Sequence, residues 1–180
     1  MADRSAGEPR AGLAQALARR RVPLGFICGV AVLWLARPTH QSLLAGGCVG
    51  AVGEAVRVWA AGHLEKGREV TSSGPYQFTR HPLYLGSTIM GIGLAIAANS
   101  VLVAAAILAY LVVTLTAAIR SEEAHLTDKF GDAYPAYRDG MSRPAPRRFS
   151  VRRAARNREY RAVMGLVMAL AVLALKMRLG

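Results

Sequence analysis

The sequence predicts an all-α integral membrane protein, a bundle of about five transmembrane helices in one domain of 180 residues. Apolar residues make up 53% of the chain and gather in runs rather than alternating, and the mean hydropathy is +0.26. The 38 residues between His81 and Arg120 carry no charge. As a continuous helix they would measure about 57 Å, roughly twice the ~30 Å hydrocarbon core of a bilayer. They therefore predict two spans that are joined by a turn at Asn99 and Ser100.

The remaining elements follow from where the charges stop and resume along the chain. Gly46 and Gly50 lie four residues apart in the second apolar run, a spacing that lets another helix approach closely. The last run is short, so it predicts either a fifth span or a helix in the membrane surface. The expected elements of the single domain 1–180 are a polar tail at 1–21, four spans within 22–119 (22–36, 41–64, 83–98 and 101–119), a polar segment at 120–161, and the last run at 162–175 within 162–180.

The positive charges predict the orientation in the membrane. Of the 23 Lys and Arg residues, 5 precede the first span, 3 lie in the loop 66–80 and 11 lie in 120–161. All 19 face the cytoplasm if the N-terminus is cytoplasmic, as the positive-inside rule requires. This distribution explains the net charge of +12 without a nucleic-acid partner. Because Arg, which has GC-rich codons, far outnumbers Lys, we expect the inner membrane of a bacterium.

The segment 143–161 is the most basic part of the chain, with eight Arg and one Glu. We expect it to dock on anionic lipid headgroups, at about 1 kcal/mol for each basic residue near the surface. Binding to RNA is the weaker alternative. The sequence leaves the oligomeric state open.

Two polar clusters flank the uncharged hairpin, which returns them to one face of the membrane. In the first, Pro82 suits the first turn of a helix, so His81 lies near its N-cap, and Tyr84 shares the helix face of His81. In the second, Glu122 and Glu123 stand where a membrane helix ends, a position at which positive charge is preferred. These residues fit a ligand site. They also fit interfacial anchors and carboxylates paired with nearby arginines.

The two clusters together resemble the isoprenylcysteine carboxyl methyltransferase family, which is related to the membrane phospholipid methyltransferases. The resemblance covers about residues 54–145. The motifs that carry it are VTSSGPY at 70–76, RHPLYLG at 80–86, EEAHL at 122–126 and FGDAYPAY at 130–137.

The resemblance implies that S-adenosylmethionine binds in a cytoplasmic pocket that these loops cap. Members of the family often carry an Arg four residues before the first Glu, at the reacting centre. Here that position is Ala118, so Arg120 or Arg57 is expected to supply the cation. The cofactor-binding residues expected from the resemblance are Val70, Thr71, Tyr76, His81, Pro82, Leu83, Tyr84 and Glu122, and Glu123 is added as its neighbour.

Glu54 and Arg57 lie three apart in the second span and share a helix face. Ionisable groups inside a span are paired with each other or functional, so they are either a structural pair or the inner wall of the substrate pocket. We name Glu54, Arg57 and Arg120 as the candidate catalytic residues. No spacing of His, Cys, Asp or Glu indicates a metal site.

The sequence therefore predicts a membrane methyltransferase that uses S-adenosylmethionine. The expected reaction is carboxyl O-methylation of a lipophilic, isoprenoid or lipid-like acceptor at the cytoplasmic face. The alternatives are a phospholipid-type N-methyltransferase and a membrane protein that keeps the fold without catalysis.

Overall fold

The protein is described by a computed structural model, which covers residues 34–141 and 146–179, and every regular element in these ranges is a helix. This confirms the all-α prediction. The expected tail at 1–21 and nearly all of the expected span at 22–36 lie outside the described residues. The long helices are α2 (His40–Ala61), α3 (Pro82–Ala98), α4 (Val101–Phe130) and α7 (Tyr160–Leu179), and the short ones are η1 (Gly74–Gln77), α5 (Ala133–Arg138) and α6 (Val151–Arg156).

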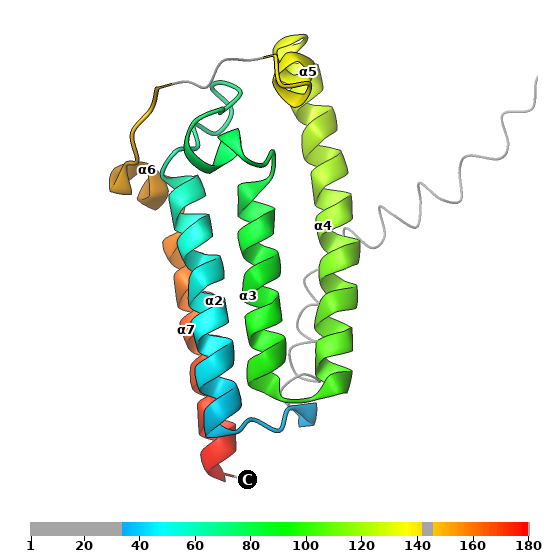
Figure 1. The fold of residues 1–180 in the computed structure, drawn as a ribbon, viewed down its shortest axis with the longest axis vertical. Helices are drawn as coiled ribbons and strands as arrows, with labels where there is room; N and C mark the ends of the chain where they lie inside the picture. Colours follow the sequence, from blue (N-terminus) through cyan, green and yellow to red (C-terminus); the bar gives the residue numbers. More distant parts are fainter. Residues whose placement is uncertain (1–33, 142–145, 180) are drawn as a thin grey trace, which may run out of the picture.

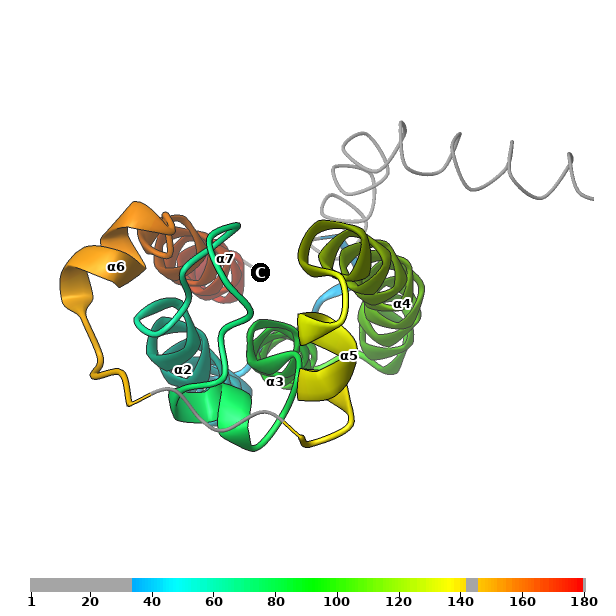
Figure 2. The ribbon, with the colours of Figure 1, turned by 90° about the horizontal axis from the view of Figure 1, so that it is seen from above.

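The four long helices run side by side, with α3 between α2 and α4 and with α7 against α2 (Figures 1 and 2). Three of them, α2, α4 and α7, are long and apolar enough to cross a membrane, while α3 is apolar but shorter, at 17 residues. We call the end of the bundle that carries η1, α5 and α6 the loop end. The opposite end, with the turn at Asn99 and Ser100, is the hairpin end.

Glycines hold α2 and α3 together at close distance. A Cβ atom at Gly53 would lie 2.6 Å from the backbone nitrogen of Met90 and 2.7 Å from the carbonyl oxygen of Gly86. A Cβ atom at Gly46 would lie just as close to the carbonyl oxygen of Gly93. This confirms the close helix approach that the spacing of small residues predicts. The α2–α3 pair is therefore the rigid centre of the bundle.

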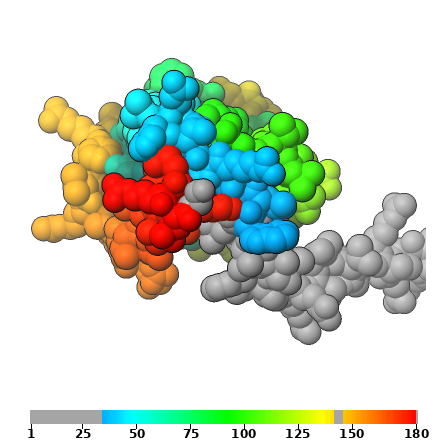
Figure 3. Space-filling model, turned by 90° about the horizontal axis from the view of Figure 1, so that it is seen from below, coloured from blue at the N-terminus to red at the C-terminus, as the bar shows by residue number. Residues whose placement is uncertain are grey.

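The hairpin end is closed by hydrogen bonds between segments far apart in the sequence. The backbone of Arg37 donates to the carbonyl of Ala98 over 2.8 Å, and the Asn99 side chain donates to the carbonyl of Arg37 over 3.0 Å. Lys176, near the end of α7, donates to the carbonyl of Trp34 over 2.7 Å. Figure 3 shows this end, with the start of the described chain in blue beside the red end of α7.

Helix α4 is longer than the sequence predicts. The expected span ends at Ile119, but the helix continues without a break to Phe130, and Gly131, with a positive φ of 52°, ends it. The polar residues after Ile119 are good helix formers, so the change of polarity does not end the helix. As a result α4 projects beyond the start of α3 at the loop end (Figure 1).

Candidate functional site

A cavity of about 1000 Å³ lies at the loop end, between α3, α4, α5, η1 and the loop 64–71. The long α4 forms one wall, and its cavity-lining residues recur at three- and four-residue intervals from Tyr110 to Phe130. Because α3 and α4 form a hairpin, the two polar clusters of the sequence meet here. Six of the expected cofactor-binding residues line the cavity: Val70, Thr71, Tyr76, Leu83, Tyr84 and Glu122.

The other three expected cofactor-binding residues lie beside the cavity and brace its walls. His81 is the N-cap residue of α3, as the sequence predicts, and its Nε2 atom lies 3.0 Å from Oε1 of Glu123 on α4. The same oxygen accepts a hydrogen bond of 3.4 Å from the hydroxyl of Tyr134 on α5, and Arg80 lies 3.7 Å from it. Pro82 is buried in the first turn of α3. Glu123 thus connects α3, α4 and α5 at one point.

Two tyrosines of α5, Tyr134 and Tyr137, complete the site, and neither is among the residues expected from the sequence. The hydroxyl of Tyr137 donates to the carbonyl of Tyr76 over 2.7 Å, which ties α5 to η1. Burial, and then the nearby Glu123 carboxylate, raise the pKa of Tyr134 to about 12, so its hydroxyl keeps its proton. Burial also raises the pKa of Tyr76. Tyr134 and Tyr137 both belong to the motif FGDAYPAY, which could have pointed to them.

The charged residues of the lining gather near the loop end. The membrane-side part of the α4 wall, from Tyr110 to Ala118, contributes only uncharged residues, and Glu122, one turn further along α4, is the first charged group. Tyr84 interacts with this Glu122 carboxylate. The charged residues that line the cavity are Lys66, Glu69, Arg80, Glu122 and Lys129.

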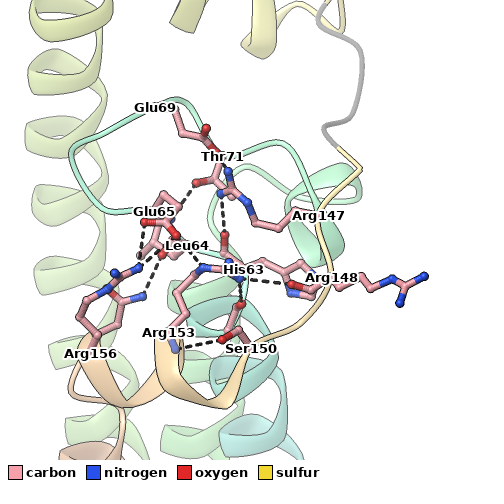
Figure 4. Close-up of polar contacts among 12 residues, drawn as sticks. His63, Leu64, Glu65, Glu69, Thr71, Arg147, Arg148, Ser150, Arg153 and Arg156 are labelled. Atoms are coloured by element: carbon pink, nitrogen blue, oxygen red, sulfur yellow. Dashed lines mark hydrogen bonds and ion pairs between the residues drawn. The ribbon is translucent and has the colours of Figure 1, made fainter.

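The loop 64–71 forms another wall, and the chain after α5 holds this loop in place (Figure 4). Arg153 donates to Glu65 over 2.7 Å and to the carbonyl of Gly62 over 2.6 Å. Arg156 lies 3.0 Å from both Glu65 oxygens. The hydrogen bond from Arg153 holds the pKa of Glu65 below its usual range, with Arg156 contributing. These contacts form what we call the clasp.

The clasp extends to the other side of the loop through Arg147. Its guanidinium lies 2.6 Å from Oε1 of Glu69 and also donates to the carbonyl of His63 over 3.3 Å. Three arginines of the basic segment therefore pair with acidic residues of the protein itself, although the sequence predicts that the segment faces lipid headgroups.

The three candidate catalytic residues are not among the residues that line the cavity. Arg120 is exposed on α4. Arg57 lies on α2 and contacts Glu159 over 2.6 Å, whereas its distance to Glu54 is 3.9 Å. Arg57 also donates to the Ser87 hydroxyl and to the carbonyl of Leu83. This geometry agrees with the structural alternative for Glu54 and Arg57, with Glu159 as the closer partner.

No group of three or more His, Cys, Asp or Glu residues in the described part of the chain could hold a metal ion. The arrangement instead suits an organic ligand with charged and apolar parts. A family model described as phospholipid methyltransferase matches residues 40–133, which is just over half of the chain and includes α2, α3 and α4.

The chain belongs to the phospholipid methyltransferase family. This is the family related to the isoprenylcysteine carboxyl methyltransferases, so the resemblance carried by the sequence motifs is confirmed. The comparisons with curated proteins and with solved structures gave no match. Membership of the phospholipid methyltransferase family, together with three helices apolar enough to cross a membrane, indicates a membrane methyltransferase.

Proposed function

We propose that the protein transfers a methyl group from S-adenosylmethionine to a lipophilic acceptor at the cytoplasmic face of the membrane in which it lies. One observation carries the proposal: a single cavity joins a charged, tyrosine-rich half at the loop end to an uncharged half along α4. The first half suits a polar cofactor. The second suits the acyl or prenyl part of an acceptor that enters from the bilayer.

The residues of the charged half fit the groups of S-adenosylmethionine. Glu122 provides a carboxylate for its cationic groups, and Lys66 and Lys129 provide positive charge for its carboxylate. Tyrosine rings offer apolar faces to the adenine. When bound, this cofactor supplies an electrophilic methyl group, so the task of the protein is to align the acceptor and to exclude water. His81 and Glu123 serve that task by fixing α3 against α4.

The acceptor atom is the finer part of the proposal, and the lining favours an amine nitrogen. A carboxylate acceptor would need a cation, but the uncharged half of the α4 wall contains Ala118 where the related family often has Arg. Arg57 is engaged by Glu159, and Arg120 does not line the cavity. Glu122 borders this half and can accept a hydrogen bond from an amine. Carboxyl O-methylation, which the sequence motifs favour, is the second candidate.

Labelled products distinguish the two reactions. The purified protein is incubated with S-adenosylmethionine that carries a labelled methyl group and with a lipid extract. We expect label in the lipid phase that mild base does not convert into a volatile product, because an N-methyl group does not hydrolyse. Release of the label as volatile methanol would instead identify a methyl ester. A protein that binds no S-adenosylmethionine would contradict the proposed function altogether.

A further inference from the structure

Seven arginines lie between residues 146 and 161, and their contacts divide them into two sets. The inner set, Arg147, Arg153 and Arg156, forms the clasp with Glu65 and Glu69. The outer set consists of Arg148, Arg152, Arg158 and Arg161, which are all exposed. No side chain of the outer set pairs with an acidic residue within 34–141 or 146–179.

The acidic residues near the outer set are already engaged. Glu65 accepts from Arg153 and Arg156, Glu69 pairs with Arg147, and Glu159 is buried against Arg57. The outer set is therefore a surplus of four positive charges without a counter-charge from the described chain. Figure 4 shows the side chain of Arg148 extending away from the clasp.

The place of the outer set in the fold is the boundary of the membrane. Helix α7 begins at Tyr160 and its 20 residues span about 30 Å, the thickness of a hydrocarbon core. The outer set flanks this start, so it lies at the level of the lipid headgroups. Exposed apolar side chains accompany it: Phe149 is 45% exposed, Val151 72% and Tyr160 51%. Aromatic and apolar residues beside cations are typical of a surface that lies in the bilayer interface.

We propose that the outer set binds the phosphate groups of anionic lipids, and that this surface is separate from the cavity. The positive charges of these arginines attract the net negative charge of anionic lipids, and the neighbouring apolar side chains insert among the acyl chains. Exposed apolar side chains at the end of a membrane helix favour a lipid over a soluble phosphate. The proposal does not depend on methyl transfer.

Competition between two lipids tests the proposal. The full-length protein in a mild non-ionic detergent is mixed with equal amounts of phosphatidylglycerol and phosphatidylcholine, and mass spectrometry of the intact complex counts the retained lipids. We expect retained phosphatidylglycerol to exceed phosphatidylcholine. The double variant Arg152→Gln/Arg161→Gln should lower this preference roughly thirtyfold, because each basic residue at the surface contributes to anionic lipid binding. The variant Arg152→Lys/Arg161→Lys should keep most of it.

The matched control removes two exposed arginines of the loop end that lie outside the outer set, Arg68→Gln/Arg138→Gln. It should leave the lipid preference unchanged. Equal loss in both double variants would overturn the proposal, as would full competition by inorganic phosphate or by a short RNA. The wild-type protein gives a test that needs no variant: raising the salt concentration must reduce the preference, because screening weakens exposed charge pairs.

Discussion

At the scale of single residues, the site depends on a few polar side chains that join separate helices. Glu123 accepts contacts from His81, Arg80 and Tyr134, which come from two other segments of the chain. Glu122, its neighbour, faces the cavity instead. Adjacent carboxylates on one helix thus have different environments, one bracing the walls and one available to a ligand.

We expect His81→Ala and Glu122→Ala each to weaken the binding of S-adenosylmethionine at least tenfold while the protein stays folded. Loss of Glu122 removes a charged hydrogen-bond acceptor, which is worth about 1.5–3 kcal/mol, or roughly a factor of 10 to 100 in affinity. Loss of His81 releases α3 from Glu123. Titration calorimetry measures the affinity, and circular dichroism checks the fold.

The matched control for these variants is Asp128→Ala, which removes an exposed carboxylate of α4 that does not line the cavity. Its affinity should equal that of the wild-type protein. Wild-type affinity in both His81→Ala and Glu122→Ala would refute this site.

The clasp gives the stability of the protein a defined dependence on pH. The pKa of Glu65 lies below its ordinary value of 4.5 in the folded protein, because Arg153 donates to it. A carboxyl group whose pKa is lower in the folded state stabilises the fold at pH values above its pKa in the unfolded chain. This stabilisation is lost as the pH falls through the pKa of the folded state. We expect Glu65→Gln to lower the melting temperature at pH 7. Below pH ~4.5, the melting temperature of the variant should fall less with decreasing pH than that of the wild-type protein.

Thermal unfolding at several pH values from pH 7 down to about pH 2 measures this difference. Glu159 and Glu54 are unchanged in the variant, so their contribution cancels in the comparison. Parallel curves for Glu65→Gln and the wild-type protein across this range would show that the clasp does not contribute.

At the scale of helices, the sequence predicts what depends on local patterns and misses what depends on partners. The start of α3 at Pro82 and the turn at Asn99 are predictable, because proline fixes the first turn and the uncharged run is twice a membrane thickness. The end of α4 is not predictable in this way, because the residues after Ile119 become charged but remain good helix formers.

The same distinction explains the basic segment. Composition alone marks it as a surface for anions, but it does not tell which arginine meets which acid. Arg153 and Glu65 are 88 residues apart, and only the folded chain brings them to 2.7 Å. The lining of the cavity is predictable to the extent that it lies in motifs, as Tyr84 and Glu122 do.

The glycines between α2 and α3 give a prediction at this scale. We expect Gly53→Ala to destabilise the protein by about 1–3 kcal/mol, because the added methyl group would meet backbone atoms of α3 that cannot move separately. Gly165 in α7 is the control, since nothing lies within 4 Å of a Cβ atom there. Gly165→Ala should stabilise its helix by up to about 1 kcal/mol. Thermal unfolding of both variants tests the comparison, and equal effects would contradict the packing.

At the scale of the whole molecule, the cavity requires that the loop 64–71 and α5 lie on one side of the membrane. In a variant without its native cysteines, Arg68→Cys and Gly140→Cys should react with an impermeant thiol reagent from the cytoplasmic side. Ser100→Cys, at the hairpin end, should react from the opposite side. Reaction of positions 68 and 140 from opposite sides would rule out the cavity.

The two sides of α3 differ in how tightly they are held. On the side of α2, glycines bring the backbone of α3 into direct contact with the backbone of α2. On the other side, Val103 is the only buried residue among the 30 residues of α4. Within the described chain, α4 is tied to α3 at the loop end through Glu123 and is packed more loosely between Glu123 and Val103. If the proposed lipophilic acceptor enters along α4, we expect the uncharged half of the cavity to adjust its width to the bulk of the acceptor's chain. A range of tail lengths and branching patterns should be accepted, while the polar head of the acceptor remains narrowly defined.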